Sequence, residues 1–263
     1  MSVPPQIPVS LGALRARKLS SESAWTLALA SRLAHESAEV AGETLSAWGF
    51  ESGELFGVAK ARGFLAATGE VVLIAFAVDD AEGRAREMAV VERPNGEVNA
   101  IAFAAFAEVQ ELLRAALRIL KAEGKAIWVT GHGLGGAVAI IAASELDAQF
   151  PIAGIHTYNP ACAGKLQFAD WFDATFLGRS YRFEATGDRI FSVAPGFRQV
   201  QQLVRLDLGD SDDVPGEESI VTTRPLDRYI ERLQSQVETE RLKRKDTTAE
   251  TRGASRSPAE DAP

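Results

Sequence analysis

The sequence predicts an α/β fold in which a mostly parallel sheet carries helices on both faces. The 263 residues, 46% of them hydrophobic, are enough for one sizeable core. Between residues 71 and 158, apolar runs typical of buried strands alternate with three- and four-residue apolar repeats typical of helices. A strand, helix, strand order of this kind joins neighbouring parallel strands by right-handed crossovers.

The first part of the chain predicts an arm, a helix and a hairpin. Residues 1–20 contain several prolines but no apolar period, so we expect an N-terminal arm there. Residues 24–40 repeat apolar side chains at helical spacing. Residues 63–67 and 71–76 are two apolar runs separated by a short turn, and the second is rich in β-branched side chains. This second run is expected to be a central strand.

The rest of the chain predicts the crossover units and a closing helix. Helices are expected at residues 100–123, 137–146 and 226–233, and strands at 126–130, 152–158, 180–185 and 200–206. We therefore expect one domain over residues 21–233. Residues 234–263 are rich in charged and small polar side chains, which cannot bury enough surface to offset the entropy of ordering. A frayed helix that runs into a disordered tail is expected there.

Composition excludes several classes of function. The net charge of -8, without a clustered basic surface, argues against nucleic-acid binding. The single cysteine, Cys162, cannot form an internal disulfide, and the N-terminus lacks the layout of a secretory signal, so a cytoplasmic location is expected. No apolar run is long enough for a membrane span. The histidines His35, His132 and His156 are dispersed without metal-ligand spacing, so we expect no metal and no cofactor.

A glycine-rich turn between a strand and a helix is the most specific motif. Residues 130–137 read T-G-H-G-L-G-G-A, which has the strand–turn–helix context of the nucleophile elbow G-x-S-x-G. Gly131 and Gly135 meet the need for a close approach of strand and helix. Gly133 stands at the nucleophile's position.

This segment resembles the class 3 (fungal-type) lipase family, whose elbow reads T-G-H-S-L-G-G-A. The likeness extends over roughly residues 36–233. It includes Tyr158-Asn159-Pro160, similar to the family's F-G-x-P turn, and Asp188, similar to its triad aspartate. The resemblance implies an α/β-hydrolase fold, a role in lipid metabolism and, if the protein is active, carboxylic ester hydrolysis.

The position of the base and the oxyanion segment also depart from the family's catalytic pattern. Arg224 opens the segment 224–233 where the resemblance places the catalytic histidine. Ala77 and Val78, with Leu134 after the elbow glycine, occupy the oxyanion region, and Asp79 follows them where a carboxylate would repel an oxyanion. Glycine supplies no nucleophile and arginine accepts no proton at neutral pH. The sequence therefore predicts a pseudoenzyme that has retained Asp188.

Several alternatives stay open at this stage. The glycine turn alone would suit a phosphate-binding loop, although its spacing fits neither common phosphate motif. His132 is interpreted as a support for the elbow, and Cys162 as a small apolar turn residue rather than a substitute nucleophile. An active esterase could use His132, Asp188 and Asp79 in an unorthodox way. A scaffold could bind a protein partner through the C-terminal tail, and an inactive site could bind a lipid or small ester-like ligand.

Two geometric expectations follow from the resemblance. Arg224 and Asp188 would stand where the family's histidine and aspartate touch, so we expect an ion pair between them. Residues 80–97, which in these lipases lead through the lid, have only a brief apolar centre, so no recruitment to lipid interfaces is expected.

Overall fold

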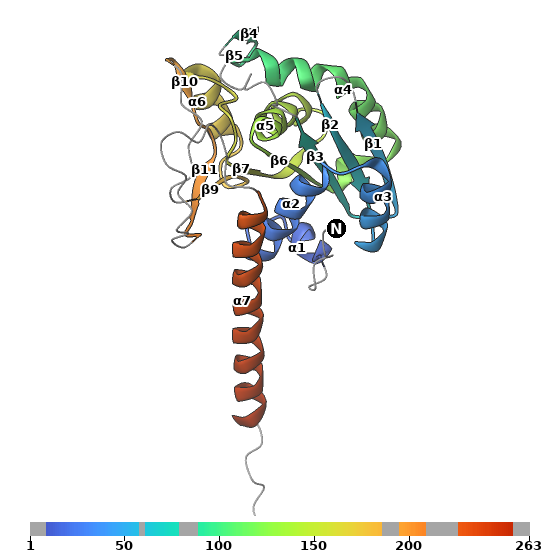
Figure 1. The fold of residues 1–263 in the computed structure, drawn as a ribbon, viewed down its shortest axis with the longest axis vertical. Helices are drawn as coiled ribbons and strands as arrows, with labels where there is room; N and C mark the ends of the chain where they lie inside the picture. Colours follow the sequence, from blue (N-terminus) through green and yellow to red (C-terminus); the bar gives the residue numbers. More distant parts are fainter. Residues whose placement is uncertain (1–8, 58–60, 79–88, 186–194, 209–225, 255–263) are drawn as a thin grey trace, which may run out of the picture.

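The computed structural model describes residues 9–57, 61–78, 89–185, 195–208 and 226–254, with side chains described as far as residue 245. A seven-stranded sheet in the order β1-β2-β3-β6-β7-β9-β11 forms the centre of the fold (Figure 1). The strands β1, β2 and β3 pair antiparallel, and every later neighbour in this sheet pairs parallel. The predicted α/β class with a mostly parallel sheet is confirmed.

The strands of this sheet are β1 (Ser52–Gly57), β2 (Arg62–Ala67), β3 (Val71–Ala77), β6 (Ala126–His132), β7 (Ile152–Tyr158), β9 (Ser180–Ala185) and β11 (Gln202–Leu206). A smaller sheet has the order β10-β8-β5-β4, with β4 (Val90–Arg93), β5 (Gly96–Asn99), β8 (Gly164–Lys165) and β10 (Phe197–Arg198). The helices are α1 (Leu11–Arg15), α2 (Ser21–Leu33), α3 (Ala38–Ala47), α4 (Ala100–Ile119), α5 (Leu134–Leu146), α6 (Leu166–Thr175) and α7 (Leu226–Ala254), with a short 3₁₀ turn η2 (Ala122–Gly124).

Helices cover both faces of the large sheet, and each face has its own apolar core. Helices α4, α5 and α6 contribute to one core, while α1, α2, α3 and α7 contribute to the other. Strand β3 is buried along its whole length between them. This explains why its sequence is a continuous apolar run rather than an alternating one.

Helix boundaries differ from the sequence expectations where caps decide them. The helix expected over 24–40 is interrupted, because α2 ends at Leu33 and Ser37 caps α3 by accepting a hydrogen bond from the Val40 amide at 3.3 Å. The helix expected from 137 begins at Leu134. The N-terminal arm contains α1, and the Trp128 indole in β6 donates to the Leu14 carbonyl at 2.8 Å, which ties the arm to the sheet.

Helix α7 continues past residue 233 into the segment for which a frayed helix is expected. It remains helical to Ala254 and projects from the body (Figure 1). Polar contacts with α2 account for the first added turns: Ser21 donates to Glu240 at 2.6 Å, and Arg241 pairs with Glu22 at 3.1 Å. No helix in the described residues has both the length and the hydrophobicity of a membrane span.

His156 lies fully buried in β7, surrounded by aromatic rings. The Trp128, Tyr181 and Phe183 ring centroids are 5.2, 5.6 and 5.4 Å from the imidazole centroid. Neither ring nitrogen has a hydrogen-bond partner within the described residues. Burial without compensation penalises the charged form and lowers the pKa of His156 from 6.5 to about 3.

This buried imidazole predicts an acid-sensitive fold. Because the pKa of His156 is lower in the folded chain than in the unfolded chain, its contribution to stability is complete above about pH 6.5 and is lost as pH falls toward 3. The free energy of unfolding should decrease by on the order of 3 kcal/mol between pH 7 and pH 4 from this group. In urea melts, His156→Phe should remove that part of the slope. Equal slopes in the two proteins would contradict the assignment.

Candidate functional site

The turn between β6 and α5 has the geometry of a nucleophile elbow. Gly133 is the only residue between the last residue of β6, His132, and the first residue of α5, Leu134. Its backbone has φ 57° and ψ −125°, a combination that residues with a side chain rarely adopt. The chain therefore reverses sharply from strand to helix at the position where the resemblance places the nucleophile.

Flanking glycines allow the strand, the helix and β3 to meet closely. A Cβ atom on Gly131 would lie 2.3 Å from the Gly135 carbonyl oxygen. A Cβ atom on Gly135 would lie 2.5 Å from the Phe76 carbonyl oxygen at the end of β3, and one on Gly136 would lie 2.9 Å from the Pro160 Cβ. Any larger residue at these positions would push the layers apart.

Backbone hydrogen bonds hold the elbow to the end of β7. The Gly133 amide donates to the Tyr158 carbonyl at 3.1 Å, and the Ala161 amide donates to the Gly133 carbonyl at 3.0 Å. Between these anchors, Asn159 has a φ of 42°, which turns the chain sharply after the strand. The turn at 158–160, noted for its similarity to F-G-x-P, thus supports the elbow directly.

The expected oxyanion region lies beside the elbow. Ala77, the last residue of β3, is fully buried, and its Cα would be 3.2 Å from a Cβ on Gly135. Val78 is half-buried and packs on the core shared with α5, and Leu134 is buried in the first turn of α5. The carboxyl ends of β3 and β6 thus bring Ala77, Val78, Gly133 and Leu134 to one edge of the sheet.

His132 is next to Gly133 but is a weak base. Its Nε2 atom is buried and has no hydrogen-bond partner within the described residues. Burial, assisted by the nearby charge of His35, lowers the pKa of His132 from 6.5 to about 4. The imidazole is therefore neutral near pH 7 and binds a proton far less readily than a free histidine does.

The Cys162 thiol and the Thr130 hydroxyl lie near the elbow, but neither is activated as a nucleophile. Burial, with a smaller opposing effect from Arg182, raises the pKa of Cys162 to about 11, so its thiolate is scarce near neutral pH. Thr130 is fully buried, and its hydroxyl bonds with the His156 carbonyl at 2.8 Å and with the Ser31 hydroxyl at 2.8 Å. Neither side chain presents a free nucleophile.

Asp188, Arg224 and Asp79 lie outside the described residues, and so does the first half of the expected lid, 80–88, so the Arg224–Asp188 ion pair remains a prediction. The structure does place the flanking segments. The Ala185 amide at the end of β9 donates to the Tyr229 hydroxyl in the first turns of α7 at 3.0 Å. Ala185 is three residues before Asp188 and Tyr229 is five residues after Arg224, so described residues that flank the two predicted positions are in contact.

The pairing of polar residues on β9 was not predicted from the sequence. Ser180, Arg182 and Glu184 share one face of the strand. Arg182 pairs with Glu184 at 2.6 Å and donates to the Val200 carbonyl at 2.7 Å, with both charged side chains mostly buried. The sequence gives no signal for this, because the strand reads as an ordinary alternation. No cluster of three or more potential metal ligands occurs among the described residues.

Comparisons with known proteins agree with this geometry. Residues 69–197, which contain the elbow, match the family model described as lipase (class 3). No curated protein sequence matches the chain.

Solved structures of fungal lipases share the fold. Lipase II from Rhizopus niveus has 16% identity and a TM-score of 0.56, over 74% of this chain and 81% of the lipase. The triacylglyceride lipase of Rhizomucor miehei has 17% identity and a TM-score of 0.56, over 75% and 81%. A mutant form of MDLA from Penicillium cyclopium has 19% identity and a TM-score of 0.55, over 82% and 85%. The sequence match over residues 69–197 and the fold shared with fungal lipases over most of the chain are consistent with a member of the class 3 lipase family.

Proposed function

We propose that this chain is a class 3 lipase-like protein that does not hydrolyse esters and acts by binding. The observation that carries the proposal is Gly133, which has the backbone geometry of the elbow and no side chain to attack a carbonyl. In a serine hydrolase, loss of the nucleophile costs roughly a million-fold in turnover. The protein thus retains the support for the reaction without the group that performs it.

The described neighbours offer no substitute chemistry. His132 is too weak a base near neutral pH, and Cys162 is a buried thiol with a raised pKa. The resemblance puts Arg224 at the position of the base and Asp79 directly after the oxyanion region, which also supports the proposal. Several independent losses favour a binding role over an unorthodox esterase, which is the main alternative.

The retained architecture suggests two kinds of binding partner. The edge of the sheet that carries Ala77, Val78 and Leu134 is suited to a lipid or small ester-like ligand, since small and apolar residues surround the elbow there. Helix α7 extends beyond its contacts with α2, where Leu242 is 62% exposed, and could dock a protein partner. We place the protein in the cytoplasm, because a single cysteine requires no oxidising compartment.

Ester hydrolysis tests the proposal directly. The purified full chain should release nitrophenol from p-nitrophenyl butyrate at the rate of buffer alone, because no acyl-enzyme can form at position 133. Turnover that coincides with the protein peak through successive purification steps, and that decreases in His132→Ala, would instead support the unorthodox esterase.

Restoring the nucleophile should not by itself restore activity. Gly133→Ser should remain unreactive toward a fluorophosphonate probe, since Arg224 cannot deprotonate the new hydroxyl. The double variant Gly133→Ser/Arg224→His, with Asp188 retained, should become labelled. Strong labelling of the single variant would show that the base has been misplaced.

A stability measurement accompanies the activity test. A side chain at φ 57° and ψ −125° is strained, so Gly133→Ser should lower the free energy of unfolding by about 1–3 kcal/mol. The matched control is Gly42→Ala in α3, where no atom lies within 4 Å of the added Cβ. That change should raise stability by roughly 0.5–1 kcal/mol. Urea melts of both variants measure the contrast, and two changes of the same sign would argue against strain at the elbow.

A further inference from the structure

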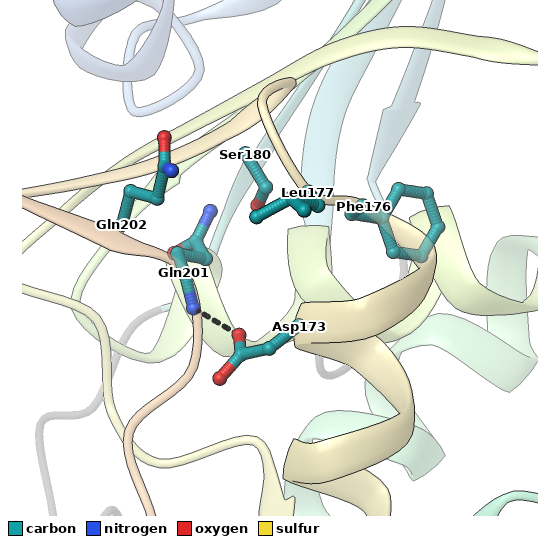
Figure 2. A pocket seen from close by; sticks show the side chains of 6 residues that line it. All are labelled: Asp173, Phe176, Leu177, Ser180, Gln201 and Gln202. Atoms are coloured by element: carbon teal, nitrogen blue, oxygen red, sulfur yellow. Dashed lines mark hydrogen bonds between the residues drawn. The ribbon is translucent and has the colours of Figure 1, made fainter.

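A pocket lies at the opposite end of β9 from Ala185 and the elbow. It has a volume of about 190 Å³ and is formed where α6 ends and where β9 and β11 begin. Its lining residues are Asp173, Phe176, Leu177, Ser180, Gln201 and Gln202 (Figure 2). In the sheet, Ser180 pairs with Ile155 of β7. Ile155 is three residues before Tyr158, which bonds to the elbow, so the pocket is ~10 Å from the elbow along the strands.

Ser180 contributes an unsatisfied hydroxyl to this pocket. The residue is only 2% exposed, and its Oγ atom has no hydrogen-bond partner within the described residues. Figure 2 shows the hydroxyl turned into the space between β9, Gln201 and the end of α6. Buried hydroxyls in folded proteins are nearly always hydrogen-bonded. The unpaired Ser180 hydroxyl can therefore form a hydrogen bond with a ligand in this pocket.

Gln201 is held in a strained conformation on the facing wall. Its φ of 76° is unusual for a residue with a side chain. Its backbone N–H donates to Asp173 Oδ1 at 2.7 Å, and its backbone carbonyl accepts from the Arg182 guanidinium at 3.2 Å. Its side-chain oxygen accepts from the Thr157 hydroxyl. The carboxamide nitrogen has only a 3.5 Å contact with the Ile155 carbonyl. The surrounding bonds thus fix the backbone and leave an N–H available to the pocket.

The charges and the volume define the ligand. Asp173 shares its carboxylate with the Gln201 amide and with Arg198 at 3.4 Å, while Arg198 also pairs with Asp170 at 2.7 Å. Two carboxylates beside one guanidinium leave a local negative charge, which disfavours anions. The Ser180 hydroxyl can donate and accept, Gln201 donates, and Asp173 accepts. Hydroxyl groups complement this set because each can both donate and accept, and the volume corresponds to about six water molecules.

We propose that the pocket between α6, β9 and β11 binds a small neutral polyol of about the size of glycerol, with Ser180 and Gln201 as its hydrogen-bonding residues. Phe176 and Leu177 provide an apolar wall for the carbon chain of the ligand. The site is separate from the elbow, so its occupancy does not depend on whether the protein hydrolyses esters.

Amide chemical shifts of the full chain titrated with glycerol test the site. We expect saturable shifts centred on Ser180, Gln201 and their strand neighbours. Ser180→Ala should weaken glycerol binding about fivefold to tenfold, the usual effect of one lost hydrogen bond, while its melting temperature stays equal to or above that of the wild type. Stability should not decrease, because the variant removes a buried hydroxyl that bonds to nothing within the described residues.

A second serine gives the matched control. The Ser144 hydroxyl in α5 donates to the Ile141 carbonyl at 2.7 Å. Ser144→Ala should therefore lower the melting temperature slightly and leave glycerol binding unchanged.

Three outcomes would overturn the proposal. The first is a set of glycerol-induced chemical shifts that do not saturate, or that persist unchanged in Ser180→Ala. The second is a melting temperature of Ser180→Ala below that of Ser144→Ala. The third is tighter binding of acetate or methylammonium than of glycerol in parallel titrations.

Discussion

The close approach of β6, α5 and the end of β3 at the elbow is the constraint on which the rest of the structure depends. A Cβ atom on Gly131 or Gly135 would fall within 2.3 or 2.5 Å of a backbone carbonyl oxygen. Because these positions have no side chains, α5 packs directly on the central sheet, and the elbow glycine bonds to the ends of β7 and the following turn. The same contact sets the edge at which Ala77, Val78 and Leu134 meet.

The geometry of the elbow does not by itself require a catalytic side chain. A serine at φ 57° and ψ −125° stores strain that is useful only when the residue reacts. Glycine adopts the same conformation at little cost, so Gly133 avoids this strain while the layers stay in contact. The turn therefore has a packing role that is independent of the chemistry at position 133.

Buried polar groups account for the features that depart from an apolar core. His156 is neutral among aromatic rings and makes the fold sensitive to acid. Arg182 and Glu184 pair with each other, whereas the Ser180 hydroxyl on the same strand face has no hydrogen-bond partner among the described residues. These groups lie on two neighbouring strands, β7 and β9, yet their environments differ enough to give one a structural role and another a place in a candidate pocket.

The sequence alone determined the α/β class, the central strand at 71–77, the crossover units and the elbow, because these depend on local periodicity and on glycines with a local steric reason. Tertiary structure decided the rest. The helix expected over 24–40 is two helices, because Ser37 caps α3. Contacts between α2 and α7 stabilise the part of α7 beyond residue 233. The edge strand β1 is mostly exposed, and its sequence has no alternating apolar pattern that would predict it. The Ser180 pocket joins residues from α6, β9 and β11 that are separated in sequence. Only packing brings such groups together, since burial and unpaired hydrogen bonds are properties of the folded surroundings rather than of the residue.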